Sequence, residues 1–212
     1  MTIVAAEQVE DEASAVHSAP LGSRRQILNA AASLLRQGYG ATTTRAIATQ
    51  VGIKPGSIYH YFPSKDAIVC EVVREGVRVV YDAVTRALGS LSTDATPQTR
   101  LETAVKAHLL SSLENSDYTS ASIRAFSSLP RPVRRECGEE RRRYEQIWSD
   151  LVAEFRQAGV LAPSVSDDSV RLLLLGAVNW AGEWYRPERM RIDDLARDFA
   201  ATVLRPRISQ PR

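Results

Sequence analysis

Apolar residues recur at intervals of three and four positions through most of the chain, beginning near Ser23. This spacing is typical of helices that bury one face. The first segment with this spacing places five apolar side chains on one face: Ile27, Leu28, Ala31, Leu34 and Leu35. Gly38 and Gly40 follow directly and end the predicted helix, because glycine is a common helix terminator.

Three more helices are predicted between residues 43 and 88. Thr43 or Thr44 can cap a short helix with the sequence RAIATQV, and Gly52 permits a sharp turn after it. Pro55 begins a second short helix, PGSIYHYF, where its missing N–H is not needed. Ser64 then caps a longer helix from about Lys65 to Leu88.

The remaining sequence also has helical periodicity and shows no convincing strand. Prolines at positions 97, 130, 132, 163, 187 and 206 fall between the periodic segments, where helix breakers are expected. The predicted helices cover residues 97–114, 118–129, 132–159 with a possible break near Gly138, 167–186 and 193–204. The pattern therefore predicts an all-α protein.

Composition and charge indicate a nucleic-acid partner. The chain has 212 residues, of which 44% are hydrophobic, so it can form a substantial core. Residues 1–22 are acidic and aperiodic, which predicts a disordered tail. Residues 23–90 carry nine basic and four acidic side chains, a net of 9 − 4 = +5. A positive excess confined to one early segment is typical of a DNA-binding module.

Several function classes are disfavoured by what the sequence lacks. Cys70 and Cys137 are far apart and form no metal-ligand spacing, so no metal or cofactor is expected and a reducing, cytoplasmic location is favoured. The N-terminus does not resemble a secretory signal. The most apolar stretch, residues 170–184, contains Arg171 and Glu183 and is too short to span a membrane.

Two short helices joined at Gly52 describe a helix-turn-helix motif, and its second helix is expected to enter the major groove of DNA. Tyr59 and His60 are too large and polar to be buried together, so we expect them to face outward and contact bases or phosphates. Tyr61 and Phe62 fit the core better. The predicted DNA-binding residues are Thr44, Arg45, Lys54, Gly56, Ser57, Tyr59, His60 and Lys65.

The stretch TTTRAIATQVGIKPGSIYHYFPSKDAIVCEVV closely resembles the DNA-binding domain of TetR-family transcriptional regulators. The resemblance implies an all-α homodimer that binds palindromic operator DNA, and a C-terminal pocket whose ligand relieves repression. It also implies family DNA contacts at six of these positions, with Arg45 as a weaker assignment: Thr44, Lys54, Ser57, Tyr59, His60 and Lys65. The expected organisation is a tail at 1–22, a three-helix DNA-binding domain at 23–68, a helical ligand-binding and dimerisation domain at 69–206, and a tail at 207–212.

The C-terminal segments LGAVNWAGEWYRP and RYEQIWSDLVAEFRQAGVL resemble a TetR subgroup in which several members respond to acyl-CoA thioesters of fatty-acid, branched-chain or sterol catabolism. Arginines of RPVRRECGEERRR are candidates for contacts with CoA phosphates, although a solvated helix face is the favoured explanation for them. Asn179 either bonds across the dimer or touches ligand. The predicted ligand-binding residues are His108, Phe126, Trp148, Asn179, Trp180, Glu183 and Trp184.

The predicted helix at 167–186 is apolar on nearly all faces, which suits a helix packed on two sides. We expect it to pair with the helix at 140–158 in a four-helix bundle between two subunits. The predicted interface residues are Leu151, Phe155, Leu172, Leu175 and Gly176.

Two alternatives to a ligand-responsive repressor remain. One is a DNA-binding regulator whose C-terminal half is purely structural, or which responds to another hydrophobic ligand. The other is an enzyme, which the sequence disfavours: the only histidines are His17, His60 and His108, and no nucleophile elbow or paired-carboxylate site is present.

Overall fold

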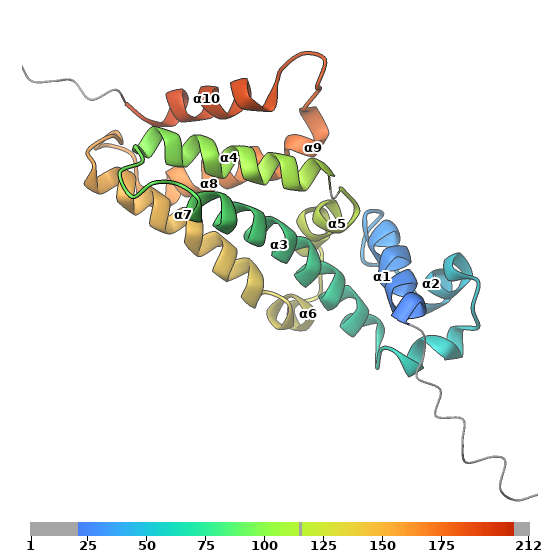
Figure 1. Ribbon diagram of the computed structural model, residues 1–212. Helices are drawn as coiled ribbons and strands as arrows, with labels where there is room; N and C mark the ends of the chain where they lie inside the picture. The colour runs from blue at the N-terminus through green and yellow to red at the C-terminus, as the bar shows by residue number, and fades with distance from the viewer. Residues whose placement is uncertain (1–20, 115, 206–212) are drawn as a thin grey trace, which may run out of the picture.

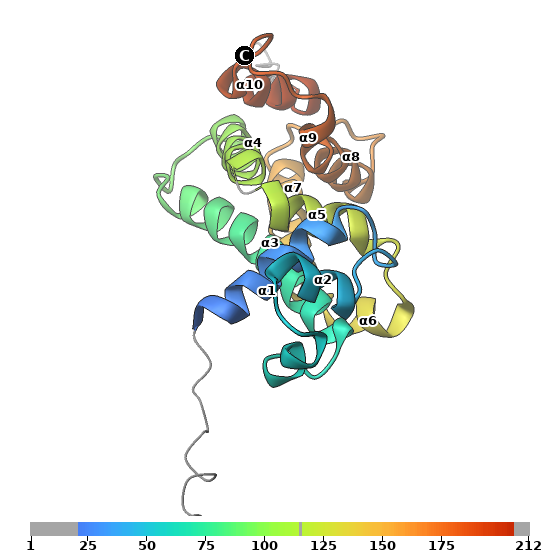
Figure 2. The same ribbon diagram turned by 90° about the vertical axis from the view of Figure 1, so that its right-hand side faces the viewer.

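The computed structural model describes residues 21–114 and 116–205, and all regular structure in these residues is helical (Figure 1). The tails predicted at 1–22 and 207–212 lie almost entirely outside the described residues. None of the helices described is long and apolar enough to cross a membrane. The helices form an elongated molecule with α1 and α2 at one end and α10 at the other (Figures 1 and 2).

The N-terminal end contains α1 (Leu21–Leu35), α2 (Thr44–Val51) and a 3₁₀ helix, η1 (Pro55–His60). Thr43 caps α2, since its hydroxyl accepts a 3.0 Å hydrogen bond from the backbone N–H of Ala46. Gly52 ends the helix with a φ of 79°, a left-handed conformation that favours glycine. The predicted third helix is therefore present, but it is wound as a 3₁₀ helix.

The long helix α3 (Lys65–Gly89) connects the two ends of the molecule, and Ser64 caps it as predicted. The helices that follow are α4 (Pro97–Glu114), α5 (Ser116–Phe126), α6 (Arg131–Glu136), α7 (Glu139–Gln157), α8 (Asp167–Asn179), α9 (Ala181–Trp184) and α10 (Ile192–Val203). The predicted break near Gly138 separates α6 from α7.

The segment at 167–186 is not one continuous helix. It divides at Trp180, whose φ of −92° and ψ of 0° interrupt the helix between α8 and α9. The carbonyl of Trp180 accepts a tight-turn hydrogen bond from the backbone N–H of Glu183, at 3.0 Å. Periodicity did not reveal this break because apolar residues continue on both sides of it.

Two buried clusters hold the described helices together. The C-terminal cluster joins α3, α4, α7, α8 and α10 around Trp148 and Phe155. The N-terminal cluster joins α1, α2 and η1 to the start of α3, and Ile58 and Phe62 are buried in it. This second cluster also includes residues of α5 and α6 and of the segment that follows each helix: Ala121, Ala125, Leu129, Val133 and Cys137.

Candidate DNA-binding and effector sites

The helix-turn-helix presents its predicted DNA contacts on the surface. Tyr59 is 58% exposed, and Arg45, Lys54, Gly56 and His60 are also exposed. Thr44 and Ser57 are half-buried. Ile58 is buried and packs η1 against the core, whereas the next residue, Tyr59, lies on the surface. This arrangement leaves Tyr59 and His60 free to meet DNA, as the sequence predicts, while Phe62 is buried and Tyr61 half-buried.

Lys65 has a structural contact that the sequence did not indicate. Its Nζ donates a 2.9 Å hydrogen bond to the Tyr39 carbonyl and lies 3.6 Å from the centre of the Tyr39 ring. Desolvation lowers the pKa of Lys65, and the neighbouring Asp66 opposes that shift. The Tyr39 hydroxyl in turn donates a 2.5 Å hydrogen bond to Asp66. Lys65 therefore ties the α1–α2 loop to the start of α3.

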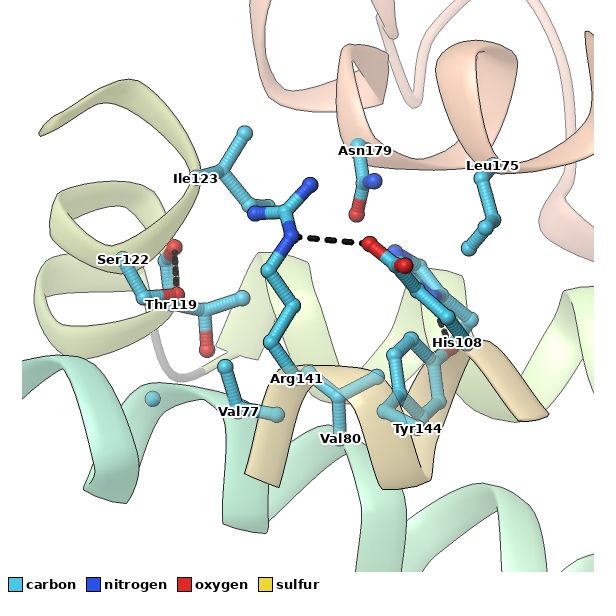
Figure 3. A pocket seen from close by; sticks show the side chains of 12 residues that line it. Val77, Val80, His108, Thr119, Ser122, Ile123, Arg141, Tyr144, Leu175 and Asn179 are labelled. Atoms are coloured by element: carbon cyan, nitrogen blue, oxygen red, sulfur yellow. Dashed lines mark hydrogen bonds and ion pairs between the residues drawn. The ribbon is translucent and has the colours of Figure 1, made fainter. Parts of the chain in front are cut away.

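A small cavity, partly open to solvent, lies between α3, α4, α5, α7 and α8 (Figure 3). Its volume is about 30 Å³, which is space for one or two water molecules. The lining residues come from all five helices: Gly76, Val77, Val80, His108, Thr119, Ser122, Ile123, Arg141, Tyr144, Glu145, Leu175 and Asn179. Gly76 permits the close packing of α3 on α5, because a Cβ there would lie 2.3 Å from the Tyr118 carbonyl oxygen.

The cavity wall contains two groups of bonded polar side chains. His108 Nδ1 and the Tyr144 hydroxyl are 2.5 Å apart. Burial lowers the pKa of His108 to about 3 and raises the pKa of Tyr144, so both are neutral at neutral pH. Arg141 Nε donates a 2.9 Å hydrogen bond to Glu145, and the Arg141 guanidinium also stacks on Phe126 at 4.6 Å.

A second, outer pocket of about 260 Å³ lies beside the cavity and shares Thr119, Ile123 and Asn179 with it. Its wall includes Arg124, which forms an ion pair with Glu183. The other lining residues are Arg36, Ser112, Leu113, Ser120, Trp180 and Gly182. The two spaces adjoin each other at their shared residues, and Arg36 and Arg124 line the outer one.

Four of the predicted ligand residues line these two spaces: His108, Asn179, Trp180 and Glu183. Trp148 is fully buried and lies edge-on to His108, with ring centres 6.3 Å apart. Trp184 is exposed and lines neither pocket, and Phe126 also lines neither, although its ring contacts the lining residue Arg141.

The sequence analysis did not single out most of the lining residues, among them Arg36, Thr119, Ile123 and Arg124. No sequence motif around these residues identifies them, because they come together at the pockets only when α1 and α5 pack against each other. Within the arginine-rich segment at 131–143, Arg141 is the residue that lines the cavity.

The predicted dimer interface needs correction at three positions. Leu151 and Phe155 are buried by their own chain, at 1% and 0% exposure, and have no surface to offer a partner. Leu175 is also buried and lines the cavity. By contrast, Leu172 is 60% exposed, and Gly176 is exposed beside it. The exposed apolar face of α8 and α9, which we call the α8–α9 face, comprises Leu172, Leu173, Gly176, Trp180 and Trp184.

An exposed helix-turn-helix joined to a second helical domain is typical of a DNA-binding transcriptional regulator. Residues 27–72 match the family of bacterial regulatory proteins called the tetR family, and residues 94–206 match the tetracyclin repressor-like C-terminal domain. The chain therefore belongs to the TetR family. It is a transcriptional repressor of this family and not an enzyme.

Individual relatives agree with this assignment. The chain is 31% identical over 197 residues to the HTH-type transcriptional repressor KstR2 of Rhodococcus jostii strain RHA1, covering 86% of this chain and 90% of that protein. The ketosteroid transcriptional regulator KstR2 of Mycobacterium tuberculosis has the same fold, with 22% identity and a TM-score of 0.70, covering 86% of this chain and 95% of that one.

The structure of AibR in complex with isovaleryl coenzyme A and operator DNA also has this fold. It shares 20% identity and a TM-score of 0.73 with this chain, and the match covers 87% of this chain and 99% of AibR. Similarity at this level shows a common architecture.

Proposed function

We propose that this repressor binds a palindromic operator as a homodimer and is released by a small, largely apolar effector, an acyl-CoA thioester of lipid or sterol catabolism. Two helix-turn-helix units would read successive major grooves, roughly 34–36 Å apart. The effector would favour a dimer geometry that no longer matches this spacing, and only a difference in its affinity for the two states can drive that change.

The observation that carries the proposal is the position of α5 between the cavity and the DNA-binding end. One face of α5 supplies Thr119, Ser122 and Ile123 to the cavity. The N-terminal turn of the same helix contacts α1, where the Tyr118 hydroxyl donates a 2.7 Å hydrogen bond to Asn29. An effector that displaces α5 therefore acts directly on the helix that supports the helix-turn-helix.

An acyl-CoA thioester is supported by the arginines that line the outer pocket and by two relatives. Arg36 and Arg124 lie at the outer pocket, where guanidinium groups are suited to phosphate oxygens. AibR was crystallised with isovaleryl coenzyme A, and the KstR2 of Mycobacterium tuberculosis is described as a ketosteroid regulator. The apolar side chains Val77, Val80 and Leu175 provide the interior with contacts for a hydrocarbon chain.

A regulator with a structural C-terminal half, or one that responds to another hydrophobic ligand, is the second candidate. The small volume of the inner cavity, about 30 Å³, favours it, because an acyl chain enters only if α5 or α8 moves. The same experiment separates these candidates.

The test is thermal melting of the purified protein with a panel of acyl-CoA thioesters, the matched free acids and free CoA. A ligand that binds only the folded state at about 100 times its Kd stabilises it by about 2.7 kcal/mol. We expect a rise in Tm with at least one thioester, absent with CoA alone, and loss of operator binding at the same concentration by fluorescence anisotropy.

A cavity-blocking variant provides the control. Ile123 lines both spaces, so Ile123→Trp should remove the thioester response while operator binding is retained. A response that survives this substitution would place the effector elsewhere. No response to any thioester would favour the second candidate.

A further inference from the structure

The inner cavity has a mostly apolar surface but is lined by several polar side chains. Its polar lining residues outnumber the apolar ones and come from α4, α5, α7 and α8: His108, Thr119, Ser122, Arg141, Tyr144, Glu145 and Asn179. Figure 3 shows Asn179 and the Arg141 guanidinium directed into the same space. Pockets for hydrocarbon groups are lined mainly by apolar side chains, with few polar groups placed to orient the ligand.

Some of these polar groups already have partners. His108 bonds Tyr144, and Ser122 Oγ donates a 2.8 Å hydrogen bond to the Thr119 carbonyl. Other polar atoms do not. Thr119 Oγ1 is buried without a hydrogen-bond partner in the described chain, and Thr119 is only 2% exposed. The Asn179 side chain is half-buried and makes no hydrogen bond with any residue that the structure describes.

Arg141 adds donors to the same space. It uses Nε for Glu145, and neither of its terminal nitrogens bonds a described residue. A guanidinium carries five N–H donors and no acceptor, so the unused groups at the cavity are mainly donors. A buried polar group left without a partner costs about 1–3 kcal/mol, and a purely hydrocarbon ligand would exclude water from these groups.

The charges around this space are balanced. Glu145 pairs with Arg141 at 2.9 Å and lies 3.9 Å from Arg171, which is itself paired with Asp168. His108 is held neutral by burial. An anionic ligand group would therefore meet little net positive charge, whereas an uncharged oxygen would meet unused donors.

We propose that Thr119, Arg141 and Asn179 recognise an uncharged oxygen, a carbonyl or hydroxyl, carried by the end of the effector that enters the inner cavity. This inference rests on the proposed function, since it assumes that the effector occupies these two spaces. It adds a selectivity: among effectors of equal size, the protein prefers those oxygenated at the buried end.

The test uses pairs of probes that differ by one oxygen. Hexanoyl-CoA is compared with 5-oxohexanoyl-CoA, and decanoyl-CoA with 9-oxodecanoyl-CoA, with the four free acids measured alongside. Kd is determined by calorimetry. We expect the oxo member of at least one pair to bind ten-fold or more tightly, because an unpaired polar group in the site is penalised strongly.

Two variants locate the selectivity. Thr119→Val and Asn179→Leu keep side-chain size and remove the polar atoms, and each should reduce the oxo preference to within about two-fold. Thr85→Val, at an exposed position of α3, is the matched control and should retain the wild-type preference. Melting curves of all variants establish that each is folded.

The outcomes separate the two proposals. Equal binding of both members of every pair would overturn the oxygen-recognition inference and leave the thioester proposal standing. Binding of the oxo free acids in preference to their partners, with no binding of any thioester, would overturn the thioester proposal and retain the inference. A preference unaffected by both variants, or no binding of any probe, would overturn the inference.

Discussion

Arg36 and Asp117 form an ion pair that joins the end of α1 to the first turn of α5, with Arg36 Nη1 2.8 Å from Asp117 Oδ1. The pair lies at the outer pocket, because Arg36 also lines that pocket. It therefore links the DNA-binding end of the molecule to the space proposed for the effector.

Breaking this pair should weaken the effector response more than it weakens the fold. Both side chains are about half exposed, so Arg36→Gln should change the free energy of unfolding by less than about 1 kcal/mol. We expect the thioester concentration that half-releases operator to rise several-fold. The double variant Arg36→Asp with Asp117→Arg, which restores a pair, should recover part of the response. Equal responses of Arg36→Gln and wild type would contradict a role for the pair.

Tyr59 should contribute to DNA binding without contributing to stability. The residue is 58% exposed, so its truncation removes little buried surface. Tyr59→Ala should reduce operator affinity at least ten-fold, consistent with about 1–3 kcal/mol for a good base contact, and leave Tm and the dimer unchanged. Gln157→Ala, at an exposed position of α7, is the control. An unaltered gel shift with Tyr59→Ala would remove η1 from the DNA interface.

The two lysines of the motif should behave differently. Lys54 is exposed, so Lys54→Ala should leave Tm unchanged, weaken DNA binding and lower the slope of log affinity against log salt by about 0.9 for each phosphate that the side chain neutralises. Lys65→Ala removes the hydrogen bond and the ring contact with Tyr39, so it should also lower Tm. Urea unfolding and anisotropy at several salt concentrations measure both effects. Equal Tm values for the two variants would argue against the structural role of Lys65.

The α8–α9 face should mediate dimerisation. Leu172 and Leu173 are 60% and 61% exposed, which is unusual for adjacent leucines on a helix of a monomer. Leu172→Glu should therefore produce a monomer in sedimentation experiments and reduce operator affinity, while helix content is retained. Leu110→Glu, at an exposed leucine on α4, is the matched control and should remain dimeric. A dimeric Leu172→Glu protein would place the interface elsewhere.

Acidification should destabilise the protein through His108. Its pKa is lowered from 6.5 to about 3, so below pH 6.5 the unfolded chain binds a proton that the folded chain excludes. Stability is lost as the pH falls from 6.5 toward 3, by about 2 kcal/mol at pH 5 from this group. His108→Gln removes this contribution. The difference in unfolding free energy between wild type and variant should therefore shrink by about that amount between pH 7 and pH 5; a constant difference would contradict the burial of a neutral His108.

Local chemistry explains which parts of the fold the sequence predicts well. The caps at Thr43 and Ser64 and the turn at Gly52 depend on residues within three or four positions, and the structure confirms them. The contacts of Lys65 with Tyr39, and of Arg36 with Asp117, join residues 26 and 81 positions apart. No periodicity encodes such pairs, because they exist only once the helices have packed.

The interface predictions show the same limit. Periodicity identified apolar faces on α7 and α8 but did not indicate which face a single chain covers by itself. Leu151 and Phe155 are enclosed by neighbouring helices of their own chain, whereas Leu172 is not. Likewise, Thr119 has no distinguishing sequence context, and its unpartnered hydroxyl becomes evident only in the cavity.

The buried cluster beneath the helix-turn-helix includes Ala121, Leu129 and Val133, which lie far along the chain from the DNA-reading residues. Consider a hybrid repressor that joins residues 21–72 of this chain to the C-terminal half of a relative. It would lose part of the buried surface on which its helix-turn-helix packs. Exchange of operator specificity between such proteins requires α5 and α6 to be transferred together with α1, α2 and η1. The residues that must be exchanged to transfer operator specificity from this chain are therefore not contiguous in the sequence.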